Sequence, residues 1–299
     1  MIAAGSLWML FTILAAAGQT ARNAMQRELT AALGTVGATH VRFLFGFPFA
    51  LVFLAGVLIA TGLPLPRPGL AYVPWIIIGA GAQIVATALM LAAMNDRSFV
   101  VTIAYIKTEA IQAALFGLIF LGDRLTMPIL AAIVIATAGV VLMSFKPGAR
   151  VQGGLKPTVL GLVSGAMFAL SAVGYRGAIL SLGLPSFVLA ATFTLACGLV
   201  LQAALLTLYL AVRDRNVLAA IARAWRPSLF AGLMGATASQ FWFLAFALTT
   251  VANVRTLALV EVLFAQAISY FMFKQKTTAR EAFGMSLIVA GVALLIWVQ

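Results

Sequence analysis

Runs of about 20 apolar residues recur along almost the whole chain, and this recurrence leaves few folds open to it. A helix that spans a bilayer needs roughly 20 such residues, whereas the strands of a membrane barrel would show a strict alternation that no run has. Only 9% of the residues are charged, against about a quarter in soluble domains. We therefore predict an all-α membrane protein with ten transmembrane helices, over residues 5–26, 36–60, 71–92, 99–121, 127–145, 158–180, 185–212, 228–249, 251–273 and 281–298.

The few chemically reactive side chains argue against catalysis. His40 is the only histidine and Cys197 the only cysteine, so a zinc site, a Ser–His or Cys–His pair and an intrachain disulfide are not expected. We find no phosphate-binding loop or dinucleotide fingerprint. The longest loops, about 146–157 and 213–227, are too short to fold alone. We expect no enzyme activity, no metal and no cofactor.

The net charge of +12 fits a membrane surface better than nucleic acid, because Lys and Arg collect in cytoplasmic loops. Thirteen of the 19 Lys and Arg residues lie in or beside odd-numbered loops and three in even-numbered loops. The other three, Arg42, Lys107 and Arg255, lie within apolar runs. This count predicts cytoplasmic odd loops, external termini, and a multi-pass protein of the plasma (inner) membrane in contact with lipid. It gives no oligomeric state.

The chain also resembles itself. A shift of 152 residues places Glu109 on Glu261, Thr126 on Thr278 and Gly139 on Gly291, and a shift of 156 places Gly18 on Gly174. The prediction is a first repeat at 1–145, a connection at 146–157 and a second repeat at 158–299. Because five is an odd number of crossings, the two repeats would insert in opposite orientations and enclose a central cavity.

The ends of these repeats carry a family resemblance. Gly122 and Asp123 close the fourth run, Thr126 precedes the fifth, and Gly139–Val140 lies near its end; Thr278 and Gly291–Val292 repeat the later part. With the ten runs and the five-plus-five repeat, the chain resembles the EamA-type members of the drug/metabolite transporter superfamily over nearly its whole length. The resemblance implies export of small metabolites, with amino acids, including aromatic ones, a prominent group. Relatives are usually drawn with cytoplasmic termini, which leaves the sidedness open.

Charged residues inside the runs are the first candidates for a substrate site, because such groups are costly in lipid. Tyr105, Glu109 and Gln112 follow an i, i+4, i+7 spacing and are expected on one helix face. Lys107 lies about 200° around the helix from Glu109, so each charge needs a partner elsewhere. In the ninth run Arg255, Gln266 and Tyr270 share one stripe, and Glu261 lies on another.

Other polar and aromatic residues within the runs complete the predicted substrate site: Gln19, Asn23, Gln83, Tyr175, Gln240 and Trp242. Two carboxylates at equivalent positions, Glu109 and Glu261, would bind an amine or carry protons. The alternative is that they only neutralise Lys107, Arg255 or Arg42. We expect His40, near the start of the second run, to be solvated.

These observations favour a secondary transporter with alternating access that exports a small polar or zwitterionic metabolite, most readily an amino acid. Protons are the expected coupling ion unless the protein is a facilitator. An exchanger of organic phosphates or nucleotide sugars is a second possibility; it predicts several converging cations, and only three lie within the runs. A scaffold or channel without an alternating cycle also stays open.

Overall fold

The computed structural model describes residues 6–96, 105–144, 156–264, 266 and 278–298, and within these ranges it contains helices and no strand. The helices are α1 (Leu7–Leu44), α2 (Phe47–Thr61), α3 (Tyr72–Asp96), α5 (Glu109–Phe116) with the π-helical η2 (Gly117–Leu121), α6 (Met127–Ser144), α7 (Lys156–Ser181), α8 (Phe187–Arg213), α9 (Arg215–Arg223), α10 (Trp225–Leu248), α11 (Val251–Leu257) with the 3₁₀ turn η3 (Ala258–Val260), and α13 (Ala279–Trp297).

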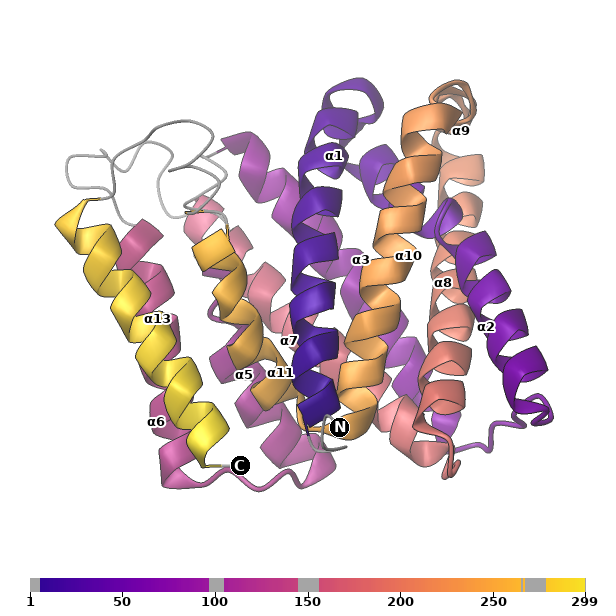
Figure 1. The fold of residues 1–299 in the computed structure, drawn as a ribbon. Coiled ribbons are helices and arrows are strands. Elements are labelled where there is room, and N and C mark those ends of the chain that lie inside the picture. Colours follow the sequence, from indigo (N-terminus) through magenta and orange to yellow (C-terminus); the bar gives the residue numbers. More distant parts are fainter. Residues whose placement is uncertain (1–5, 97–104, 145–155, 265, 267–277, 299) are drawn as a thin grey trace.

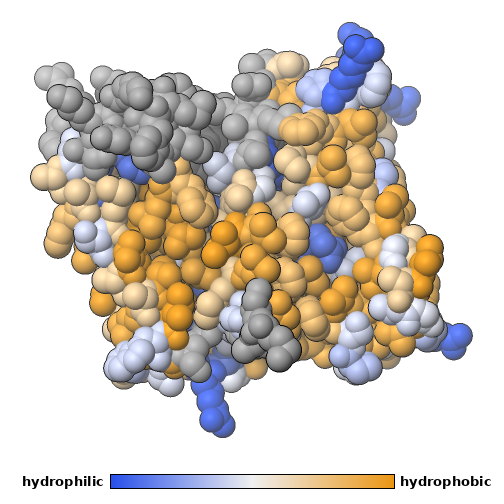
Figure 2. Space-filling model, viewed as in Figure 1, coloured by the Kyte–Doolittle hydropathy of each residue, from blue (hydrophilic) through white to orange (hydrophobic). Residues whose placement is uncertain are grey.

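Helices of membrane-spanning character make up most of the structure. In the described part of the chain, six segments are long and apolar enough to cross a bilayer: Ala32–Thr61, Tyr72–Ala93, Thr158–Ser181, Phe187–Arg213, Trp225–Leu248 and Ala279–Trp297. Many large apolar side chains, including Ile59, Leu208 and Val212, are exposed. Figure 2 shows hydrophobic residues across the middle of the visible face, with hydrophilic ones toward its edges. The prediction of an all-helical membrane protein is confirmed.

The helices lie side by side, with α6 and α13 at one end of the molecule and α2 and α8 at the other (Figure 1). The centre holds α5, α11, α7 and α1. Figure 1 also shows that both described ends of the chain lie at the lower edge, where α6 begins and α13 ends, so these two helices run antiparallel. The first and last described residues therefore lie on the same side of the molecule.

Glycines allow the closest helix approaches, since a side chain there would meet backbone. A Cβ on Gly139 of α6 would lie 2.5 Å from the Gly284 carbonyl oxygen of α13, and one on Gly291 would lie 2.7 Å from the Ala132 carbonyl oxygen. Gly139 and Gly291, and likewise Ala132 and Gly284, are separated by 152 residues. The 152-residue shift that aligns the two halves of the sequence therefore also exchanges the residues on the two sides of the α6–α13 contact.

Two other helix pairs, α1–α10 and α7–α3, also pack closely at glycines that the sequence repeat aligns. Gly18 of α1 packs against Ala238 of α10, where a Cβ would lie 3.1 Å from the Ala238 Cβ. Gly174 of α7 packs against Gly79 of α3, where a Cβ would lie 2.7 Å from the Gly79 nitrogen. Gly18 and Gly174 are the residues that the 156-residue shift aligns.

The prediction of a loop between residues 26 and 36 was wrong. The helix continues to Leu33 and breaks only at Gly34, whose φ of 68° and ψ of 175° are non-helical. A positive φ costs glycine little because it lacks a Cβ. The polar residues after position 20 weaken the hydropathy signal, but most of them are good helix formers, so the end of the apolar run does not mark the end of the helix.

The expectation that residues 213–227 form only a loop was also wrong, since they contain α9. The Asp214 side chain accepts a hydrogen bond from the Asn216 nitrogen at 3.1 Å and caps the helix. Ile221 is buried and Val217 packs against the same cluster, so an i, i+4 pair holds α9 against the other helices. The predicted break near Thr249–Asn253 is confirmed, because α10 ends at Leu248 and α11 begins at Val251.

Candidate functional site

Each intramembrane acid follows an interruption of its helix. Lys107 and Thr108 form a turn before α5, in which the Thr108 hydroxyl donates to the Tyr105 carbonyl oxygen at 2.7 Å. Glu261 follows η3, which replaces regular α-helix at Ala258–Val260. The two interruptions are 152 residues apart. Discontinuous helices deep in a membrane protein are typical of transporter binding sites, because they turn backbone and side-chain polar groups toward a cavity.

Two ion pairs connect the acids to the opposite half of the chain. Lys107 pairs with Glu261, and the Arg255 Nη1 lies 3.6 Å from the Glu109 Oε1. All four residues are buried, with 3 to 8% of their surface exposed. The expectation that Lys107 and Glu109 find partners on other helices is therefore confirmed. Each half contributes one cation and one anion to this reciprocal arrangement.

Aromatic rings surround the Arg255 guanidinium. Its central carbon lies 4.6 Å from the Trp242 ring centroid and 5.4 Å from that of Phe246, within the range of cation–π attraction. The Trp242 indole donates a hydrogen bond to the Gln19 Oε1 at 3.2 Å. Helices α1, α10 and α11 thus fix the position of the guanidinium that faces Glu109.

The charged residues line a small cavity of about 20 Å³, which has room for about one water molecule. Its lining consists of Gln19, Arg22, Met90, Ile106, Lys107, Glu109, Phe168, Arg255 and Glu261. A metabolite would need far more space. The two ion pairs therefore leave little free volume between these side chains.

A second cavity of about 20 Å³ adjoins the first and shares Gln19, Phe168 and Arg255 with it. Gln83 and Tyr175 lie on its wall. The Gln83 Oε1 accepts hydrogen bonds from the Tyr175 hydroxyl at 3.1 Å and the Gln202 Nε2 at 2.9 Å. This network joins α3, α7 and α8. We call the two spaces the acidic cavity, which contains Glu109 and Glu261, and the arginine cavity, which contains Arg42 and Arg255.

Three predicted residues, Gln240, Gln112 and Tyr105, lie away from these cavities. Gln240 donates to the Thr192 hydroxyl at 2.7 Å, Gln112 donates to the Leu162 carbonyl oxygen at 3.5 Å, and Tyr105 packs on Gly161 of α7. Tyr105 and Gln112 both contact α7, whereas Glu109 faces Arg255 of α11, so the structure does not bring these three side chains to one contact.

The remaining predictions fall partly outside the described part of the chain. Asn23 lies in α1, but its side chain is not among those described, and Tyr270 lies outside the described residues. Gln266 is helical and partly exposed, and it lies shortly after the helical residues 261–264. These three residues therefore stay predictions.

Sequence reasoning missed two buried arginines. Arg22 was read as a flanking charge and Arg42 only as an alternative partner, yet 2% and 4% of their surfaces are exposed and each lines a cavity. His40 was expected to be solvated and is fully buried, with its Nε2 3.0 Å from the Thr207 hydroxyl. The position of Arg42 inside an apolar run could have identified it as a candidate site residue.

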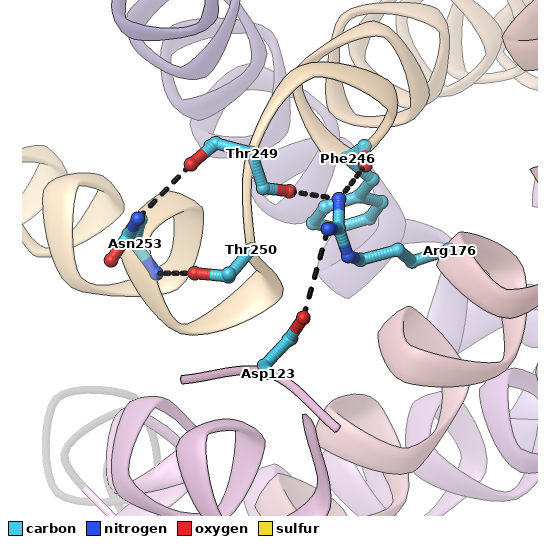
Figure 3. A network of polar contacts seen from close by, with 6 residues as sticks. All are labelled: Asp123, Arg176, Phe246, Thr249, Thr250 and Asn253. Atoms are coloured by element: carbon cyan, nitrogen blue, oxygen red, sulfur yellow. Dashed lines mark hydrogen bonds and ion pairs between the residues drawn. The ribbon is translucent and has the colours of Figure 1, made fainter. Parts of the chain in front are cut away.

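A separate polar network joins α7, the segment before α6 and the junction between α10 and α11 (Figure 3). The Arg176 Nη1 donates to the carbonyl oxygens of Phe246, at 2.6 Å, and Thr249, at the end of α10, and its Nη2 lies 3.7 Å from the Asp123 Oδ1. A cation at a helix C-terminus is favourable because the last carbonyls lack helical partners. Asn253 connects α11 to this network, because its Nδ2 donates to the Thr249 hydroxyl at 3.0 Å.

We expect Arg176→Gln to lower the free energy of unfolding by about 2 kcal/mol, since it leaves helix-end carbonyls without their charged donor. Asp123→Asn should lower the free energy of unfolding by less than about 1 kcal/mol, because the ion pair of Asp123 with Arg176 is long and partly exposed to solvent. Burial also raises the pKa of Asp123, an effect that Arg176 partly offsets, so the Asn variant removes an unfavourable buried charge as well. Unfolding in detergent checks this order; equal losses would show that the ion pair dominates.

Comparisons with known proteins report the fold and no function. One solved crystal structure, described only as that of a protein, is similar over 100% of this chain and 98% of its own, with a TM-score of 0.69 and 15% identity. No family model matches the chain, and no curated protein does. At this identity the similarity extends to the arrangement of the helices alone.

Proposed function

We propose that this protein is a secondary transporter that exports small zwitterionic metabolites, most readily amino acids, by alternating access. The observation that carries the proposal is the reciprocal pair of buried ion pairs, Lys107–Glu261 and Arg255–Glu109. A zwitterion offers one cation and one anion, so it can replace the partners within these pairs without leaving a charge uncompensated in a low-dielectric interior.

The helix packing supports the accompanying proposal of ten helices in two inverted five-helix repeats. The α6–α13 contact matches itself under the 152-residue shift, and α1–α10 and α3–α7 use the aligned Gly18 and Gly174. Antiparallel α6 and α13 fit a pseudo-two-fold axis in the membrane plane. Such symmetry gives inward- and outward-facing states of similar energy. Together with the sequence pattern, it favours membership of the drug/metabolite transporter superfamily.

In this mechanism the ion pairs hold the two halves together when no substrate is bound. Substrate binding separates them, and the amine of a zwitterion pairs with Glu109 or Glu261. Protons are the proposed coupling ion. We place the odd loops in the cytoplasm on the charge count; labelling of a cysteine in 146–157 by an external impermeant reagent would contradict that placement.

The transport proposal is tested by counterflow in proteoliposomes loaded with unlabelled amino acids, phosphorylated metabolites or organic cations. Acceleration of labelled amino-acid entry by internal amino acid is the expected result, because a carrier exchanges ligands through one site. Arg67→Gln, which removes an exposed cation outside both cavities, is the control and should keep the rate. Acceleration only by phosphorylated metabolites, or no acceleration by any class with folded protein, would overturn the proposal.

A further inference from the structure

Among the residues that the structure describes, Arg42 has no ion-pair partner. Only 4% of its surface is exposed, its Nη1 donates to the Thr87 hydroxyl at 3.3 Å, and its Nε has no hydrogen-bond partner. No described carboxylate forms an ion pair with it, whereas Lys107 and Arg255 each have one. A guanidinium does not lose its proton in proteins, so this charge persists at a cost in the membrane interior.

The surroundings of Arg42 provide little compensation. Its central carbon lies 5.3 Å from the ring centroid of the neighbouring Phe43, a contact that offsets only part of a desolvation penalty. The Thr87 hydroxyl already donates to the Gln83 carbonyl oxygen at 2.8 Å, so it can accept from Arg42. These contacts orient the guanidinium without neutralising it.

The two cavities differ in charge. Glu109 and Glu261, the buried acids of the described residues, line the acidic cavity together with Arg22, Lys107 and Arg255. The arginine cavity has two guanidiniums, Arg42 and Arg255, and no carboxylate in its lining. Half of its remaining lining residues are aromatic: Phe168, Tyr175, Trp242, Phe243 and Phe246. Cations beside aromatic rings match a ligand that joins an anionic group to an apolar or aromatic one.

We propose that the arginine cavity is the subsite for the carboxylate of the substrate, with Arg42 as its principal anchor and an apolar or aromatic side chain against Trp242 and Phe246. This inference rests on the proposed transport function and specifies its substrate class: monocarboxylates with an apolar or aromatic portion. The amine of such a substrate then points across Gln19, Phe168 and Arg255, which both cavities share, toward the acids. Movement of these three side chains would join the cavities into one binding site.

The test measures ligand binding by thermal unfolding of the purified protein in detergent. Phenylacetate should raise the melting temperature, and phenylacetamide, which keeps the ring and lacks the anion, should not. Arg42→Met should melt at or above the temperature of the ligand-free wild type, because it removes an uncompensated buried charge. It should also weaken phenylacetate binding by roughly tenfold to a hundredfold, the loss expected for charge-assisted hydrogen bonds.

Arg176→Gln is the matched control, since it removes a largely buried guanidinium outside both cavities; its phenylacetate-induced shift should equal that of the wild type. Arg42→Lys keeps the charge without the planar fork and should bind with intermediate affinity. Equal shifts with phenylacetate and phenylacetamide, an unchanged phenylacetate shift in Arg42→Met, or failure of that variant to fold would each overturn the subsite. Because this assay requires no transport, a positive counterflow result with no response to phenylacetate would leave the carrier proposal intact.

Discussion

Glu109→Gln is expected to lower the free energy of unfolding by about 3–5 kcal/mol, the range for removing one partner of a buried ion pair. The substitution keeps the shape of the side chain and leaves the Arg255 guanidinium, 3.6 Å away in the wild type, without its carboxylate. Arginine has no neutral form in proteins. The Trp242 ring would retain only part of the stabilisation, about 1–2 kcal/mol. Equilibrium unfolding in mixed detergent micelles measures the loss.

Two companion variants separate the ion pair from other effects of the substitution. Glu261→Gln leaves Lys107, whose long flexible side chain lets its ammonium move toward water, so this variant should lose clearly less stability. The double variant Glu109→Gln/Arg255→Gln removes both charges and should recover most of the stability. If the losses from Glu109→Gln and Arg255→Gln were simply additive, the two groups would not interact, and the ion pair would not hold the halves together.

The same double variant separates stability from transport. If the charges only neutralise each other, it should fold and still accelerate counterflow. The proposed mechanism instead predicts a folded protein without amino-acid counterflow, because the substrate amine no longer has a carboxylate at position 109. Loss of activity together with loss of folding would carry no information for Glu109→Gln alone, and the stable double variant removes that ambiguity.

The helical membrane class and most helix positions were predictable because hydrophobic length alone specifies them. The break between α10 and α11 was also located, from the polar residues between Thr249 and Asn253. The Gly34 break and α9 were not. Hydropathy reports where lipid contacts the chain, whereas α1 continues beyond its apolar run and α9 depends on an Asp214 cap and a short i, i+4 pair.

The candidate site was predictable in its charges and not in its geometry. Glu109, Lys107, Arg255 and Glu261 were identified because charged residues are rare and costly within membrane spans and usually mark a functional site. Helical spacing grouped Tyr105 and Gln112 with Glu109, whereas the first two contact α7 and Glu109 pairs with Arg255 of α11. Which cation would face which acid depended on the contacts between distant helices, and a single sequence contains no direct signal for them.

Gly291→Leu is expected to lower the free energy of unfolding by about 3 kcal/mol or more, at the upper end of the range for overpacking. Its Cβ alone would lie 2.6 Å from the Ala136 nitrogen and 2.7 Å from the Ala132 carbonyl oxygen. Both atoms belong to the backbone of α6, so no side-chain rotation relieves the clash and the helices must separate. Thermal and denaturant unfolding in detergent measure the effect.

The control for this prediction is Gly56→Leu in α2. An added Cβ there meets nothing within 4 Å, and the residue is exposed on the outside of the molecule. The same change in volume and hydrophobicity should therefore alter stability by less than about 0.5 kcal/mol. Gly139→Leu should resemble Gly291→Leu, because the two glycines occupy matching places in the α6–α13 contact. Equal, small effects at positions 56, 139 and 291 would mean that α6 and α13 do not approach closely, and the proposed symmetry axis between them would lose its support.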